Sequence, residues 1–281
     1  MKWIVGLLLL AVATAACLQY GRWSADRAEA ERAWASLLRP TMPLPERFDP
    51  AMVASLPEPA RRYFGHAIQP GTRLSAVVEI HMEGVLSLGS KEDPKYQAMS
   101  ADQVLAPPHG LVWRVRVGQG LTQVEGSDGM VADRSWTRFW LLRLIPVARA
   151  GGDPDHLRSS FGRVVAEAAF WAPAFLLPRP GVEWTALDAD TARATVTHGV
   201  WRQAVDIRVG PDGQPLWVSL PRWSNANPEQ VFRVQPFGGG LSDFREVSGY
   251  RLPFRVDGGN LFGTPQYFPF YRARVVGIRV R

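Results

Sequence analysis

Residues 191–220, TARATVTHGVWRQAVDIRVGPDGQPLWVSL, decide the fold class. Apolar and polar side chains alternate in the segments 192–197, 201–209 and 214–220, as they do in strands with one buried face. Between the last two segments, residues 210–213 read Gly-Pro-Asp-Gly, a sequence typical of tight turns. Such short connections join neighbouring antiparallel strands, so we expect an antiparallel sheet here.

The same alternation recurs along the rest of the chain. Further candidate strands are 73–82, 96–104, 111–117, 121–125, 241–247, 250–256 and 271–280. Ser-Asp-Gly at 127–129 is typical of a turn, and the three glycines at 238–240 are typical of a flexible hairpin loop. The patterns predict about ten antiparallel strands, hence a mainly β (α+β) fold.

Two helices are expected beside these strands. Asp153 and Pro154 give a capping acid followed by a proline in the first turn, and apolar residues then recur at helical spacing as far as Trp171. Asp49 and Pro50 give the same start signal for an earlier, proline-interrupted helix.

The N-terminal segment is apolar and uncharged from Trp3 to Tyr20. About eighteen helical residues span roughly 27 Å, close to the thickness of the hydrocarbon core of a bilayer. Three interpretations stay open. Residues 3–20 could be an uncleaved anchor in a bacterial inner membrane with the domain facing the periplasm, a lipoprotein signal with lipidation at Cys17, or a cleaved signal peptide.

A short connecting region follows. Ser24 to Leu38 is typical of a helix capped by Ser24, and the prolines between residues 40 and 45 indicate an extended linker. We therefore divide the chain into a signal anchor or signal peptide (1–22), a helix with a proline-rich stalk (23–48) and one main domain (49–281).

Charge and motifs exclude several functions. The net charge is +6, but the arginines alternate with apolar residues in 113–117 and 278–281, which indicates solvated strand faces and no nucleic-acid partner. Neither a catalytic motif nor a phosphate-binding or dinucleotide motif occurs, so we predict no catalytic residue and no cofactor. His81 and Glu83 share a strand face but are a weak metal candidate, and ordinary surface polarity is the alternative.

The sequence offers a set of candidate ligand-binding residues. Among the eleven tryptophans, those of the main domain could fill its core or form the aromatic wall of an apolar cavity. Arg163 and Glu167 are four residues apart and could pair on an exposed surface or in front of such a cavity. The candidates are Trp113, Trp136, Trp140, Arg163, Glu167, Trp171, Trp184 and Arg222. The segment 136–147 is rich in large apolar residues and could be a buried strand or a lip that touches acyl chains.

Several motifs resemble an uncharacterised family of bacterial membrane-anchored proteins. They are Leu-Pro-Glu-Pro at 56–59, His-Gly-Leu-Val-Trp at 109–113, Leu-Ile-Pro-Val-Ala at 144–148 and, most specifically, residues 163–173, with Gly-Val-Glu-Trp at 181–184 after them. The resemblance covers roughly residues 50–280 and implies a fold similar to the lipoprotein-localisation carriers LolA and LolB. In that fold a half-open antiparallel barrel has helices over its concave face. LolA is soluble, and a membrane anchor departs from that pattern.

These observations favour a membrane-tethered envelope protein that is not an enzyme and that binds a lipid, a lipidated protein or another apolar ligand. An envelope assembly protein, which would bind a protein partner through a sheet edge or segment 136–147, is the alternative. An enzyme with an unrecognised site is a third.

Overall fold

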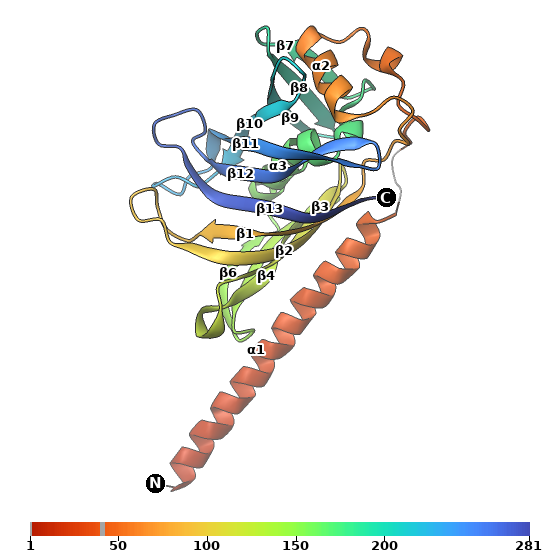
Figure 1. The fold of residues 1–281 in the computed structure, drawn as a ribbon. Coiled ribbons are helices and arrows are strands. Elements are labelled where there is room, and N and C mark those ends of the chain that lie inside the picture. Colours follow the sequence, from red (N-terminus) through yellow and green to blue (C-terminus); the bar gives the residue numbers. More distant parts are fainter. Residues whose placement is uncertain (1, 40–42) are drawn as a thin grey trace.

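The computed structural model describes residues 2–39 and 43–281. In these residues, thirteen strands form one sheet with the order β6-β5-β4-β3-β2-β1-β13-β12-β11-β10-β9-β8-β7 (Figure 1). Every neighbouring pair is antiparallel. The strands are β1 (Val78–Ser87), β2 (Tyr96–Ala106), β3 (Gly110–Val117), β4 (Val124–Val131), β5 (Arg134–Leu141), β6 (Ile145–Gly151), β7 (Val182–Ala186), β8 (Thr191–His198), β9 (Trp201–Val209), β10 (Pro215–Ser224), β11 (Arg233–Val247), β12 (Tyr250–Asn260) and β13 (Phe268–Val280).

The predicted mainly β antiparallel fold is confirmed, with more strands than expected. The three strands beyond the ten are β5, β6 and β7. The segment 136–147, a possible buried strand, is divided between the partly buried β5 and the mostly exposed β6. β5 has no clean alternation because both of its faces are covered, and β7 has only 5 residues. The predicted turn at 210–213 joins β9 to β10, and Gly210 N–H donates to the Gln214 carbonyl at 2.9 Å.

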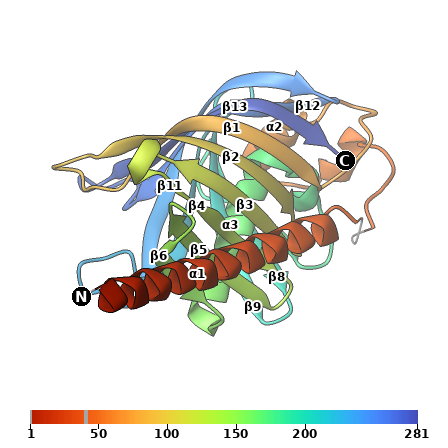
Figure 2. The ribbon, with the colours of Figure 1, turned by 90° about the horizontal axis from the view of Figure 1, so that it is seen from below.

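The helix α3 (Pro154–Trp171) lies in the hollow of the sheet (Figure 2). It contacts β5 and β6 near one edge of the sheet and β9 and β10 near the other, so the sheet bends around it without closing. The Asp153 carboxylate accepts a hydrogen bond from His156 N–H at 2.8 Å, which confirms the predicted cap. Phe161, Val164 and Val165 are fully buried against the concave face, and each such side chain contributes about 1.5–3 kcal/mol of burial energy.

A 3₁₀ turn and a short helix cover one end of the sheet. The 3₁₀ turn Pro50–Val53 begins at Asp49, whose carboxylate accepts from Ala51 N–H, and α2 (Glu58–Ala67) follows. α2 contacts β7, β8, β9 and β12. Further 3₁₀ turns are Gly120–Thr122 and Pro173–Leu176.

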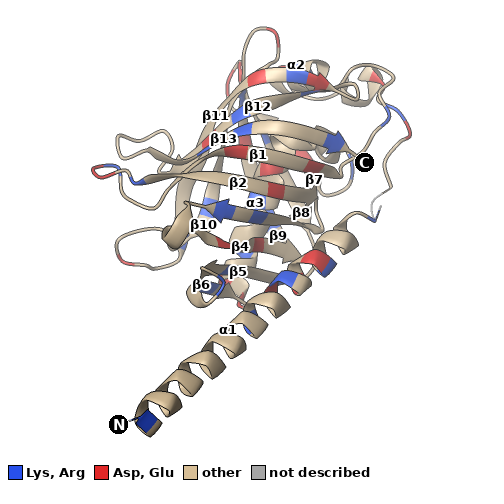
Figure 3. Cartoon of the chain, turned by 60° about the horizontal axis from the view of Figure 1, so that its bottom comes forward, with Lys and Arg blue, Asp and Glu red and all other residues tan. Residues whose placement is uncertain are grey.

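The N-terminal helix α1 (Lys2–Leu37) is continuous over 36 residues. The break expected between Gly21 and Ser24 is absent, because one glycine weakens a helix without ending it. In the described part of the chain, α1 is the one helix long and apolar enough to cross a membrane. Its first half is exposed, and no charged side chain occurs between Lys2 and Arg22 (Figure 3).

The second half of α1 packs against the convex face of the sheet, on the side opposite α3 (Figure 2). Ala30, Ala33 and Leu37 are buried there against Val104, Ala106, Val112 and Trp136. The helical part of the segment 23–48 therefore lies on the sheet, and residues 40–42 of its proline-rich part lie outside the described residues.

Two predicted loops are strand segments. Residues 127–129 lie inside β4, where a Cβ on Gly129 would come within 2.5 Å of the Trp136 ring, so the glycine serves ring packing rather than a turn. Residues 238–240 lie inside β11, and a Cβ on Gly239 would collide with the Asp257 carbonyl. Both segments use glycine for the close approach of a neighbouring strand.

Candidate functional site

An open cavity lies between α3 and the concave face of the sheet, and we call it the inner cavity. Its volume is about 300 Å³. Strands β1, β3–β5 and β10–β13 supply its other walls. Its aromatic lining consists of Trp113, Phe139, Phe170, Trp171, Phe237, Phe270 and Tyr271.

Arg163 of α3 is the centre of an ion-pair network at this cavity. Its Nε donates to Glu167 Oε1 at 2.6 Å, and its Nη1 donates to Asp128 Oδ2 at 2.9 Å. Its Nη2 donates to Gln103 Oε1 at 3.1 Å. Burial alone would lower the pKa of Arg163, but the charges of Glu167 and Asp128 outweigh it and raise that pKa above its usual value. The guanidinium is therefore charged and already neutralised by two carboxylates.

Arg222 of β10 lines the same cavity, where the charges of Asp128 and Glu167 act on it without a salt bridge. Its guanidinium lies 4.8 Å from the centre of the Phe237 ring, and its Nε donates to Ser159 Oγ at 3.3 Å. It forms no salt bridge with any carboxylate of the described residues. Burial and the nearby charge of Arg163 lower the pKa of Arg222 to about 10. At neutral pH it is a cation that can accept an anionic partner.

Tyr271, Asp257 and Trp113 bring three more polar groups to the inner cavity. The pKa of Tyr271 is raised by burial and then by the charge of Glu167. Burial also raises the pKa of Asp257. The indole Nε1 of Trp113 is buried and has no hydrogen-bond partner, so it is an unused donor.

The predicted site residues divide into two groups. Trp113, Arg163, Glu167, Trp171 and Arg222 line the inner cavity. The pair Arg163–Glu167 is partly buried there, and the exposed alternative does not apply to it.

Three predicted tryptophans lie elsewhere. Trp136 and Trp140 lie on the convex face of β5, where α1 covers them. Trp184 packs against Tyr63 and Phe64 of α2, and its Nε1 donates to the Leu176 carbonyl at 2.9 Å.

Sequence reasoning missed several wall residues, namely Phe139, Phe170, Phe237, Tyr271 and Asp257. Phe139 alternates with the outward-facing Trp140, so the period of two could have paired it with Trp113. The others depend on which strands meet across the hollow, which the sequence pattern does not fix.

The remaining candidate groups have ordinary partners. His81 Nδ1 lies 2.8 Å from Asp102, and Glu83 pairs with Arg274 at 2.6 Å. Within residues 2–39 and 43–281, no group of three or more His, Cys, Asp or Glu side chains is arranged to hold a metal ion. Cys17 is exposed in the first half of α1.

A model described as "Family of unknown function (DUF6544)" matches residues 46–273. The chain belongs to this family. The predicted membership of a family without an assigned activity is therefore confirmed. A comparison with curated proteins gave no significant match.

Two solved structures are similar to the DUF6544 chain. A LolA superfamily protein from Nitrosomonas europaea is 7% identical and has a TM-score of 0.39, over 73% of this chain and 85% of that one. A putative outer membrane lipoprotein-sorting protein domain from Vibrio parahaemolyticus is 11% identical and has a TM-score of 0.36, over 73% of this chain and 86% of that one.

Proposed function

We propose that the DUF6544 chain is a membrane-anchored envelope protein that binds the apolar part of a lipid or lipidated molecule in its inner cavity. The observation that carries this proposal is that the space between α3 and the sheet is open. Its volume of about 300 Å³ lies at the lower end of ligand pockets, and its walls are mostly aliphatic and aromatic. Burial of apolar ligand surface there contributes about 25 cal/mol per Å².

Arg222 is the group at this cavity that favours an anionic head group on the ligand. Arg163 is neutralised by Glu167 and Asp128, whereas Arg222 has no carboxylate partner among the described residues. A cation in a partly desolvated, apolar setting attracts an anion more strongly than it would in water. A fatty acid or a phospholipid with one chain inserted fits this chemistry.

The direction of α1 supports a membrane source for the ligand. The cavity walls include Leu86 and Phe139, which lie near the ends of β1 and β5. The β5–β6 turn lies at this same end, and the guanidinium of its Arg143 lies 4.9 Å from the Trp23 ring of α1. The apolar half of α1 continues from this end, away from the sheet (Figure 1).

We assign residues 3–20 to an anchor in the bacterial inner membrane and the domain 49–281 to the periplasmic side. The helix runs without a break past Ala16 and Cys17, where a cleaved signal or a lipoprotein signal would be cut. One continuous helix joins the segment 3–20 to the docked second half of α1 and so to the folded domain.

Filling the inner cavity tests the binding proposal. Gly258 is a wall residue, and a Cβ built on it would lie 3.7 Å from Tyr271 and 3.8 Å from Phe237. Gly258→Leu therefore directs a side chain into the cavity. Gly277→Leu in β13 is the matched control, since its Cβ would meet no atom within 4 Å.

The full chain would be delipidated, incubated with bacterial lipid extract and analysed by native mass spectrometry. We expect lipid adducts on the wild type and on Gly277→Leu, and their loss on Gly258→Leu at an unchanged unfolding temperature. Absence of adducts on the wild type, or equal adducts on a folded Gly258→Leu, would overturn the proposal.

A protein partner is the second candidate function, and the edge strand β6 favours it. Ile145 is 54% and Val147 is 50% exposed on this strand, which has a neighbour on one side only. Such an edge can accept a strand from another protein. A photo-crosslinker at residue 147 in cells that captured one dominant protein would support this function over lipid binding.

A further inference from the structure

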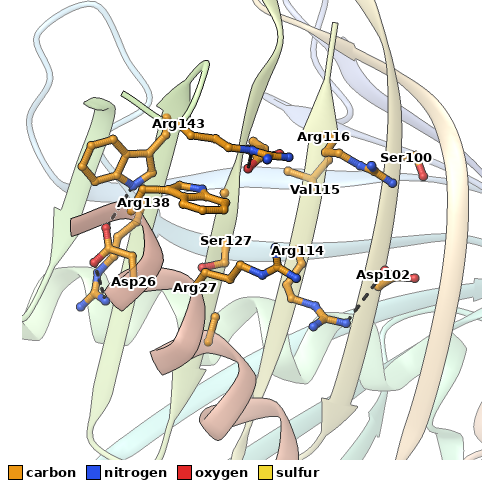
Figure 4. A pocket seen from close by; sticks show the side chains of 15 residues that line it. Asp26, Arg27, Ser100, Asp102, Arg114, Val115, Arg116, Ser127, Arg138 and Arg143 are labelled. Carbon is orange, nitrogen blue, oxygen red and sulfur yellow. Dashed lines mark hydrogen bonds and ion pairs between the residues drawn. The ribbon is translucent and has the colours of Figure 1, made fainter. Parts of the chain in front are cut away.

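A second cavity lies on the opposite side of the sheet, between α1 and the convex face of β2–β5, and we call it the outer cavity (Figure 4). Its volume is about 340 Å³. Its charged lining residues are the arginines Arg27, Arg114, Arg116, Arg138 and Arg143 and the acids Asp26, Asp102 and Glu125. The five arginines exceed the three carboxylates, so the cavity has an excess of positive charge.

The carboxylates are already occupied by ion pairs. Asp26 pairs with Arg138 at 3.2 Å and with Arg149 at 2.6 Å, while Glu125 pairs with Arg143 at 2.8 Å. These contacts fix the rim of the cavity and neutralise part of its charge. Arg27 pairs with Glu31 of α1 at 3.0 Å. Arg114 and Arg116 of β3 are left as the cations that could bind a ligand.

Arg114 and Arg116 are poorly satisfied. The nearest carboxylate to Arg114 is Asp102 at 3.9 Å, and that acid already contacts His81 at 2.8 Å. The Nε of Arg114 is buried without a hydrogen-bond partner, and its guanidinium lies 4.2 Å from the Trp34 ring centre. Arg116 forms no salt bridge within the described residues and lies beside Ser100 of β2. The guanidinium of Arg116 is exposed and has no carboxylate partner among the described residues, so it is accessible to an oxygen-rich anion.

The outer cavity begins where the apolar half of α1 ends. Its lining includes Trp23, whose ring centre lies 5.1 Å from that of Tyr20, the last residue of the apolar segment. Tryptophan and tyrosine are enriched at the level of lipid head groups. With residues 3–20 in the bilayer, Trp23 and the end of the cavity that it lines lie close to the phosphate layer.

We propose that the outer cavity binds the phosphate of an anionic phospholipid from the leaflet that surrounds α1. Arginine presents paired N–H donors that match two phosphate oxygens, and Ser100 adds a hydroxyl beside them. The inference rests on the membrane anchor of the proposed function but is independent of ligand binding in the inner cavity. A bound head group would join α1 to β3 and stabilise the docked arrangement.

The test uses the full chain in nanodiscs of phosphatidylcholine with and without phosphatidylglycerol. Native mass spectrometry after gentle release measures which lipid stays bound. We expect phosphatidylglycerol to be retained over phosphatidylcholine by the wild type. The variants Arg116→Gln and Arg114→Gln/Arg116→Gln should lose this preference by about tenfold or more, since charged hydrogen bonds contribute about 1.5–3 kcal/mol each.

Arg202→Gln in β9 is the matched control, because Arg202 is an exposed arginine outside both cavities. Arg116→Gln removes no salt bridge, so unchanged folding is expected and can be checked by urea unfolding. Equal retention of both lipids by the wild type, or an unchanged preference in the folded variants, would overturn the inference.

Two further experiments complete the test. The first distinguishes a lipid head group from free phosphate as the ligand, and the second distinguishes this inference from the proposed binding in the inner cavity. Inorganic phosphate is added to the detergent-solubilised chain; binding of phosphate there, with displacement of phosphatidylglycerol in nanodiscs, would assign the site to free phosphate and overturn the lipid inference. Gly258→Leu should keep the phosphatidylglycerol preference while it loses inner-cavity adducts. Failure of the chain to enter nanodiscs would overturn the anchor and this inference together.

Discussion

The carboxylate of Asp26 in α1 accepts a hydrogen bond from the indole Nε1 of Trp140 in β5 at 3.0 Å. The same carboxylate pairs with Arg149 of β6, so one side chain joins the N-terminal helix to two strands. We expect Asp26→Ala to weaken the docking of α1 by about 1–3 kcal/mol, because it leaves a buried indole donor unpaired. Hydrogen exchange should accelerate in residues 24–37 and stay slow in α3. Unchanged hydrogen exchange in α1 would show that its apolar contacts alone hold it on the sheet.

The network around Arg163 should contribute to stability. Glu167→Gln removes the charge that accepts from Arg163 Nε, and we expect the free energy of unfolding to fall by about 2 kcal/mol. Glu31→Gln is the matched control: it breaks another i,i+4 arginine–glutamate pair, but the Glu31 side chain is 48% exposed. We expect that control to change stability by about 0.3–0.5 kcal/mol. Equal effects in urea unfolding would contradict a special role of the cavity pair.

Arg222 should select the charge of the ligand. We expect Arg222→Gln to weaken binding of a fatty acid by about tenfold or more and to leave binding of the matching fatty alcohol unchanged. Because the pKa of Arg222 is about 10, the wild type should keep its preference at neutral pH and lose it as the pH rises through that value. Fluorescence displacement with both ligands measures the ratio, and a fatty acid preference that survives Arg222→Gln would refute this role.

Stability should fall as the solution becomes acidic. Burial lowers the pKa of His66 and of His109, so the unfolded chain takes up their protons at a higher pH than the folded chain does. The free energy of unfolding therefore declines as the pH drops below the unfolded histidine pKa of about 6.5, and the decline ends below the folded pKa values.

Urea unfolding between about pH 7 and pH 5 checks this dependence. The His66→Gln variant should show a shallower decline than the wild type, since the Nε2 atom of His66 is buried without a partner. A decline of equal slope in the variant would mean that His66 does not contribute.

Elements with local signals could be predicted from the sequence. The start of α3 depends on Asp153 and Pro154, and the β9–β10 turn depends on residues 210–213; both lie where their sequences place them. The strand over residues 127–129 could not be predicted in this way. Its glycine is required by the ring of Trp136 in the next strand, and this contact is visible only after the strands have paired.

Only part of the candidate site could be predicted from the sequence, because only part of it depends on local spacing. Arg163 and Glu167 share one face of one helix, so their pairing follows from spacing. Their other partners, Gln103 and Asp128, come from β2 and β4. The sequence does not show toward which face of β5 the side chains of Trp136 and Trp140 point. Because α1 covers the convex face of β5, both faces of this strand are apolar, and hydrophobicity does not distinguish them.

The unbroken course of α1 has a mechanical consequence for an anchored protein. Thirty-six residues make a rod of about 54 Å whose upper part is fastened to the half-barrel. Rotation of the inserted part therefore turns the whole domain, and the two diffuse in the bilayer plane as a single particle. If the chain is anchored and binds a ligand as we propose, such a body cannot carry that ligand away from the membrane. The ligand must be passed to a molecule that meets the domain at the membrane surface, so collisions there would set the rate of transfer.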